Sequence, residues 1–109
     1  MRIRNVKNKE EILDNCSFLL NNPKEYKGKF KELFANDNPI YLEIGMGKGQ
    51  FIYENAKKYK DINFIGIERF DSIMAKAILK MEEVPNLRLI KYDASLIEEV
   101  FDYEIDKLY

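Results

Sequence analysis

The alternation of strand-like and helix-like stretches after residue 39 constrains the fold of this chain most strongly. Short runs rich in β-branched and apolar residues are expected as strands at 40–44, 62–67 and 87–92. Stretches with apolar residues at helical spacing follow them, at 50–59, 72–83 and 95–101. Buried strands joined by helices are typical of a parallel sheet with both faces covered. The fold class is therefore predicted to be α/β, a Rossmann-like doubly wound parallel sheet.

Both ends of the chain depart from this alternation. Residues 1–38 are predicted to form a basic helical extension, with a helix capped by Asn8 that runs from Lys9 to Leu20 and a short helix around Phe30. Residues 39–109 form the second unit, and 105–109 are expected to open a fourth strand. A domain seldom stops partway along a central strand, so the chain is expected to be a fragment that holds three to four strands. The first strand is then expected to keep an unpaired edge that promotes self-association.

Composition narrows the possible chemistry. The 109 residues include no His and one Cys, Cys16, which argues against a zinc site and excludes a nucleophile paired with a histidine base. No apolar run is long enough for a membrane span, and the charged start Met1–Arg4 is unlike a signal peptide. Cys16 is expected to be a buried thiol in a reducing compartment, which favours a cytoplasmic protein.

The net charge of −1 conceals an uneven distribution. Residues 1–31 carry eight Lys or Arg against four Asp or Glu, whereas the rest of the chain carries ten against fifteen. The basic segment is suited to contact phosphate backbones, and a solvated lysine-rich surface is the other interpretation. Charge alone does not choose between them.

Three alternating glycines, Gly45, Gly47 and Gly49, lie between the first predicted strand and the helix after it. Glycine lets the backbone turn sharply and approach a ligand, and the helix start offers free N–H groups. The motif differs from the dinucleotide fingerprint, whose third glycine falls on Gln50, and it lacks the P-loop ending. Glu43, two residues before Gly45, would repel a pyrophosphate but suits a cationic ammonium. The loop is therefore predicted to bind S-adenosylmethionine rather than NAD.

Acidic residues also follow the next two predicted strands. Glu68, with Arg69 beside it, lies about twenty residues after the loop, where such folds place an acid on the ribose hydroxyls. Asp93 is expected to accept from the adenine amino group while Ala94 donates a backbone N–H. Helix capping is the other interpretation of Asp93. Glu43, Glu68 and Asp93 would then meet at the carboxyl edge of the sheet.

These motifs resemble those of the bacterial tRNA (guanine-N7-)-methyltransferases. The resemblance rests on the runs 42–51, 63–68, 86–88 and 93–94, and on three front-end runs at 1–4, 22–28 and 36–40. It implies the class I methyltransferase fold and S-adenosylmethionine contacts by Glu43, Glu68 and Asp93. It also implies methyl transfer to N7 of a guanosine in the tRNA variable loop. The family's catalytic aspartate belongs to a later Asp-Pro-Trp segment, so no catalytic residue is named, and the chain is expected to be inactive alone. A non-catalytic module completed by a partner, another class I methyltransferase and a dinucleotide-dependent oxidoreductase remain alternatives.

Overall fold

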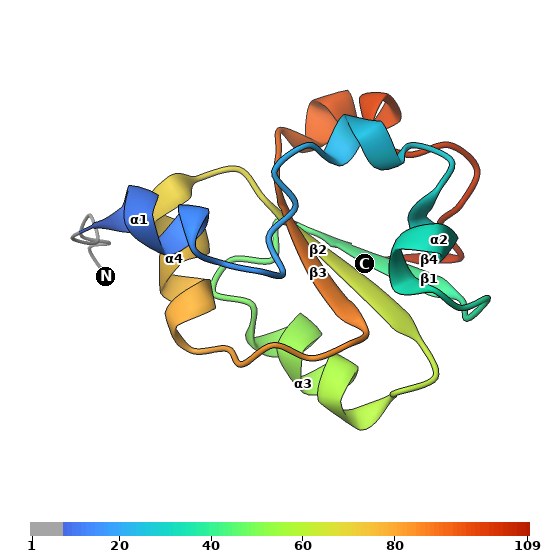
Figure 1. Ribbon diagram of the computed structural model, residues 1–109, viewed down its shortest axis with the longest axis horizontal. Helices are drawn as coiled ribbons and strands as arrows, with labels where there is room; N and C mark the ends of the chain where they lie inside the picture. The colour runs from blue at the N-terminus through green and yellow to red at the C-terminus, as the bar shows by residue number, and fades with distance from the viewer. Residues whose placement is uncertain (1–7) are drawn as a thin grey trace.

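A four-stranded parallel sheet forms the centre of the computed structural model, which describes residues 8–109 (Figure 1). The sheet order is β3-β2-β1-β4, and every neighbouring pair is parallel. The strands are β1 (Ile40–Ile44), β2 (Asn63–Glu68), β3 (Leu87–Lys91) and β4 (Lys107–Leu108). The predicted Rossmann-like α/β fold is thus confirmed, including a fourth strand close to the chain end.

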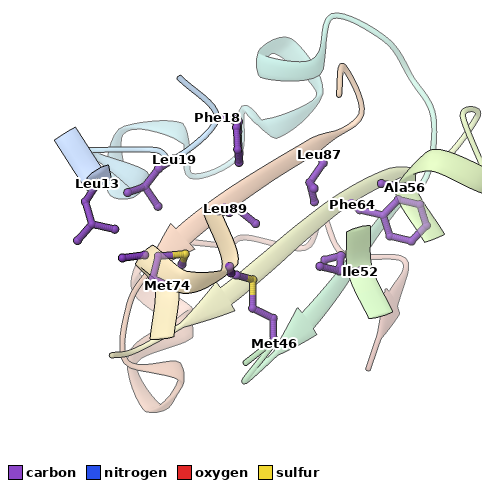
Figure 2. Close-up of a cluster of buried hydrophobic side chains, with 12 residues drawn as sticks. Leu13, Phe18, Leu19, Met46, Ile52, Ala56, Phe64, Met74, Leu87 and Leu89 are labelled. Atoms are coloured by element: carbon purple, nitrogen blue, oxygen red, sulfur yellow. The ribbon is translucent and has the colours of Figure 1, made fainter. Parts of the chain in front are cut away.

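Helices cover both faces of the sheet. The α-helices are α1 (Lys9–Asp14), α2 (Phe30–Phe34), α3 (Gln50–Lys58) and α4 (Asp71–Leu79), and the 3₁₀ helices are η1 (Pro23–Tyr26) and η2 (Ala94–Glu99). Strand residues alternate between two cores, so that Tyr41 packs with the core under α3 and α4 while Leu42 belongs to the other. Figure 2 shows the first core, where Ile52 of α3 and Met74 of α4 surround strand residues.

The predicted helix from Lys9 to Leu20 is wrong beyond its first turns. Helix α1 ends at Asp14, and Asn8 occupies the N-cap position with left-handed backbone and no side-chain cap bond. Residues 18–20 instead lie beside β3: the Leu89 N–H donates to Phe18 O at 2.8 Å, and the Leu20 N–H donates to Leu89 O at 2.9 Å. The free edge of β3 therefore outcompetes helix propagation, because it satisfies backbone groups on both segments.

Two later helices are shorter or tighter than predicted. Helix α4 stops at Leu79 rather than Glu83, although Met81 still packs against the core. The predicted helix at 95–101 is the 3₁₀ helix η2, and the buried Val100 and Phe101 lie just after it. Apolar spacing located both segments but not the type or the end of either helix.

The outer edge of β1 is not left unpaired, contrary to the sequence prediction. Strand β4 pairs with it through Tyr41↔Lys107 and Leu42↔Leu108. Asp106 extends this attachment, since its side chain accepts from the Ile40 N–H at 2.8 Å and its own N–H donates to Ile40 O at 2.8 Å. The free edge on this side of the sheet therefore belongs to β4.

The front segments share their cores with the sheet. Leu13, Phe18 and Leu19 pack in one core, and Phe30 and Phe34 in the other. The boundary between residues 38 and 39 stays a prediction about chain organisation. The Met-Arg-x-Arg start and three of the predicted basic residues (Arg2, Arg4 and Lys7) lie outside the described residues.

Candidate functional site

The glycine loop connects β1 to α3 at the carboxyl edge of the sheet. Gly45, Gly47 and Gly49 all have positive φ angles, of 67°, 59° and 77°. A Cβ on Gly45 or Gly47 would meet no atom within 4 Å, so this side of the loop faces open space. The loop therefore presents bare backbone to whatever lies above the sheet edge.

A methionine between the glycines fixes the loop to the sheet. Met46 is buried in the core that Figure 2 shows. Its N–H donates to Ile67 O at 2.9 Å. Its sulfur lies so close to β2 that a Cβ on Gly66 would be 2.5 Å from it. The sequence analysis did not predict the role of Met46. The signal for it was Gly66, because a glycine inside a buried strand marks a close approach by another group.

Glu68 holds the same loop from β2. Its side chain is only 6% exposed. One carboxylate oxygen accepts from the Gly47 N–H at 3.1 Å, and the other accepts from the Arg69 and Phe70 N–H groups at 2.9 and 3.0 Å. A carboxylate offers about four acceptor positions. Three of these positions are filled by backbone N–H groups, so Glu68 organises the loop and has about one position left for a ligand hydroxyl. The contact with both ribose hydroxyls stays a prediction.

We expect Glu68→Gln to destabilise the chain by about 1–3 kcal/mol, because an amide nitrogen would replace an oxygen that faces backbone N–H donors. Urea denaturation followed by circular dichroism measures this loss. The matched control is Glu98→Gln, since Glu98 is also a glutamate but its side chain is exposed at the surface. Equal denaturation midpoints for the two variants would show that Glu68 does not hold the loop.

The carboxyl group of Glu43 has a buried oxygen that lacks a hydrogen-bond partner. Its Oε1 is the one buried side-chain nitrogen or oxygen among residues 8–109 without a hydrogen-bond partner. Burial raises the pKa of the carboxyl group, with no compensating cation. Strand alternation places the side chain on the same face as Tyr41, beneath the start of α3. A half-buried carboxylate with one buried, unpartnered oxygen is suited to accept a hydrogen bond from a cationic group.

Asp93 follows β3 and begins the 3₁₀ helix η2. Its Oδ1 accepts from the Ser95 N–H at 3.0 Å and from the Ser95 hydroxyl at 2.9 Å. These hydrogen bonds lower the pKa of Asp93, and the nearby Arg69 guanidinium lowers it further. Asp93 Oδ1 thus caps the start of η2, as the second interpretation of this residue predicted. The attraction between Arg69, which follows β2, and Asp93, which follows β3, links the ends of these two strands.

The predicted site residues lie at two levels of one sheet edge. Glu43 pairs in register with Gly66, two residues before Glu68, so its Cα is about 7 Å further into the sheet. The glycine loop, Glu68 and Arg69 are directly connected by hydrogen bonds and sequence, and Asp93 with Ala94 lies at the neighbouring strand end. All three acids lie near the carboxyl ends of their strands: Glu43 is one residue inside β1, Glu68 is the last residue of β2 and Asp93 follows β3 by two residues.

Two further observations concern the described residues. No group of three or more His, Cys, Asp or Glu side chains within 8–109 is placed to hold a metal ion. In the same part of the chain, no helix has the length and apolarity needed to cross a membrane.

A sequence profile of the protein family described as "Putative methyltransferase" matches residues 37–109. Similar proteins carry the name tRNA (guanine-N(7)-)-methyltransferase. The relative from Bacillus cytotoxicus is 46% identical over 92% of this chain and 48% of its own length. The one from Streptococcus pneumoniae is 45% identical over 100% of this chain and 54% of its own length. The chain thus spans about half the length of the curated relatives it matches.

Solved structures support the fold. The antibiotic-resistance methyltransferase Kmr aligns with a TM-score of 0.51 at 18% identity, over 61% of this chain and 37% of Kmr. The plantazolicin methyltransferase BamL, solved in complex with a triazolic desmethylPZN analog and SAH, aligns with a TM-score of 0.54 at 21% identity. That alignment covers 78% of this chain and 31% of BamL. At these identities the likeness concerns the arrangement of strands and helices.

Proposed function

Because this chain belongs to the methyltransferase family whose profile it matches over residues 37–109, we propose that it is the S-adenosylmethionine-binding part of a tRNA (guanine-N7-)-methyltransferase. One observation in the structure carries the choice of cofactor. The buried Glu43 Oε1 has no partner, and it lies beneath a loop whose bare backbone faces open space. An ammonium group satisfies that oxygen, whereas a diphosphate would add negative charge beside it.

The residues present fit this cofactor. Glu43 would hold the amino group of the methionine part, and Gly45 and Gly47 would let the cofactor approach the backbone. Gly49 is buried, and a Cβ there would collide with the Met81 side chain, so this glycine serves packing within the chain. Glu68 would accept one ribose hydroxyl, with Arg69 beside it, and the free Oδ2 of Asp93 would accept from the adenine amino group while Ala94 donates. When bound, the cofactor supplies a methyl group whose bond to sulfur breaks as guanine N7 bonds to the carbon with its lone pair, leaving S-adenosylhomocysteine and a cationic N7-methylguanine.

The chain's contribution to this reaction is placement. Met46 and Glu68 fix the loop from both sides, so that the backbone needs little rearrangement when the cofactor binds. Such prior positioning aligns a methyl donor with its acceptor and lowers the entropic part of the barrier. The reaction asks little of acid–base groups in this chain, since the lone pair of guanine N7 is already available.

The names of the relatives support tRNA as the substrate. The described part of the basic segment contributes the half-buried Lys9 and four exposed residues, Lys24, Lys27, Lys29 and Lys31. Lys24 pairs with Glu99 at 3.4 Å, which leaves the other three exposed lysines for solvent or phosphate. We propose that they contact the tRNA backbone, and that the protein acts where tRNA is modified, in the cytoplasm.

The test compares two ligands by titration calorimetry on the same preparation. S-adenosylhomocysteine is expected to bind, and NAD is expected to show no heat of binding at equal concentration. Methionine alone and adenosine alone should each bind more weakly than the whole nucleoside, because each occupies one end of the site. Binding of NAD without binding of S-adenosylhomocysteine would replace this proposal with a dinucleotide-dependent oxidoreductase.

A further inference from the structure

We propose that a cavity at the amino edge of the sheet binds a small molecule with an apolar ring and a single carboxylate. The cavity lies between the end of α3, the turn after α2 and the segment that leads into β3 (Figure 1). The glycine loop and the proposed cofactor site lie at the opposite ends of the strands. The inference therefore goes beyond the proposed function and does not depend on it.

Hydrogen bonds from buried asparagines hold the walls of this cavity in place. Its volume is about 580 Å³, within the range of about 300–1,000 Å³ that small-molecule sites occupy. On one side Asn86, which lines the cavity, donates through Nδ2 to three carbonyl oxygens around the end of α3, at 2.9–3.0 Å (Ala56, Tyr59 and Ile62). On the other side Asn63 Nδ2 donates to Asn36 Oδ1 at 2.6 Å, which ties the turn after α2 to the start of β2. The walls are therefore formed before a ligand binds.

Apolar side chains form much of the lining. Phe34 and Ala56 are buried, and Val84 and Pro85 are half-buried and exposed. An apolar ring that enters the cavity leaves water and packs against these four residues, which is favourable in proportion to the apolar area removed from solvent. Apolar walls with a few polar groups are typical of ligand sites. The apolar part of the proposed ligand follows from this lining.

The charged side chains in the lining are all positive. Lys57 and Lys60 line the cavity, and no Asp or Glu in the described part of the chain does. Lys57 Nζ already lies 3.3 Å from Glu54 Oε1, whereas Lys60 forms no ion pair with another described residue. The guanidinium group of Arg88 lies 5.6 Å from the ring centre of Phe34, which adds positive charge behind the apolar wall. One ammonium group without a partner beside apolar walls favours a ligand with a single carboxylate.

The experiment titrates the complete, isotope-labelled chain with 2-naphthoate and follows its amide signals by NMR. The largest shifts should fall on Asn36, Ala56, Lys60 and Asn86, with a dissociation constant of about 1 mM or below, as expected for a ligand of this size. The neutral 2-naphthamide has nearly the same shape and no charge. It should bind roughly threefold more weakly or worse, because it loses the attraction of the lysines.

Two pairs of variants test the charge of the lining. Val84→Asp should weaken binding of 2-naphthoate roughly tenfold or more, because it places a negative charge in the cavity, whereas the matched Val84→Asn has nearly the same shape and should stay within threefold of the unchanged chain. Lys60→Gln should weaken binding roughly threefold. Its control is Lys48→Gln, since Lys48 is an exposed lysine at the carboxyl edge and should leave the affinity unchanged. Circular dichroism establishes that each variant is folded.

Three results would overturn the inference: equal binding of 2-naphthoate and 2-naphthamide, equal affinities of the Val84→Asp and Val84→Asn chains, or shifts centred on the glycine loop. Competition by S-adenosylhomocysteine would overturn it as well, because it would place 2-naphthoate in the proposed cofactor site. A chain that binds 2-naphthoate at the amino edge but binds no S-adenosylhomocysteine upholds this inference and counts against the proposed function.

Discussion

Glu43→Gln will weaken binding of S-adenosylhomocysteine roughly ten- to hundredfold, because hydrogen bonds to charged groups contribute about 1.5–3 kcal/mol. The substitution keeps the size of the side chain and removes the charge that we propose holds the ammonium group. Titration calorimetry at pH 7.5 on the unchanged and substituted chains measures the ratio of dissociation constants. Circular dichroism on both establishes that the fold is retained.

Lys48→Ala is the control for this experiment. Lys48 lies in the same loop, between Gly47 and Gly49, and its side chain is exposed. Loss of an exposed cation changes the local charge without touching the buried oxygen, so the affinity should change little. Equal losses for Glu43→Gln and Lys48→Ala would show that Glu43 is structural and that the ammonium lies elsewhere.

The pH dependence of the cofactor-free chain gives an independent measurement. The pKa of Glu43 is raised by burial above its ordinary value of 4.5. The folded state therefore binds the proton of Glu43 more tightly than the unfolded state does. The stability that this proton contributes is fully present below pH 4.5, and it is lost as the pH rises through the raised pKa of the folded state. Glu43→Gln should accordingly gain stability over the unchanged chain between pH 4.5 and neutrality. Urea denaturation midpoints at both pH values test this.

Binding should show the linked effect. Protonation removes the charge of Glu43, so affinity for S-adenosylhomocysteine falls as the pH drops through the raised pKa, and binding near that pH releases a proton. Calorimetry in two buffers of different ionisation enthalpy detects that release. The Glu43→Gln chain should release fewer protons under the same conditions.

The sheet could be predicted from the sequence because its signals are local. The run Ile40–Ile44 is apolar and ends at a glycine, and it forms β1 with those bounds. Helix α3 begins at Gln50, directly after the glycine loop, as predicted. The spacing of apolar residues was insufficient to predict a segment that could either continue a helix or pair with the edge of the sheet. Phe18 and Leu19 carry apolar side chains at helical spacing, yet the edge of β3 takes their backbone into a bridge.

The site was predictable in its residue types but not in its connections. The position of Glu68 after β2 followed from the strand pattern, whereas its hydrogen bonds to three backbone N–H groups depend on how the loop folds back over it. The same holds for Glu43: the charge was visible in the sequence, and its lack of a partner is a property of packing. Sequence patterns place such groups at an edge, and tertiary structure decides which of their atoms remain free for a ligand.

Gly47→Ala should lower affinity for S-adenosylhomocysteine at least tenfold while the chain still folds. Gly47 has a φ of 59°, which costs a residue with a Cβ about 1–2 kcal/mol. The added methyl group meets no protein atom within 4 Å, so it projects into the space above the loop, where we propose the cofactor lies. Affinity is measured by calorimetry and stability by urea denaturation.

Gly28→Ala separates backbone strain from obstruction of the ligand. Gly28 also has a positive φ, of 78°, and open space around its Cβ position, and its N–H likewise donates to a glutamate, Glu104, at 2.8 Å. Glu104 precedes β4, so this glycine lies by the opposite, amino end of the strands. Both substitutions should destabilise the chain to a similar extent, and only Gly47→Ala should weaken ligand binding. If both variants bind S-adenosylhomocysteine as tightly as the unchanged chain, the cofactor does not approach the backbone at Gly47, and the glycine loop serves the turn alone.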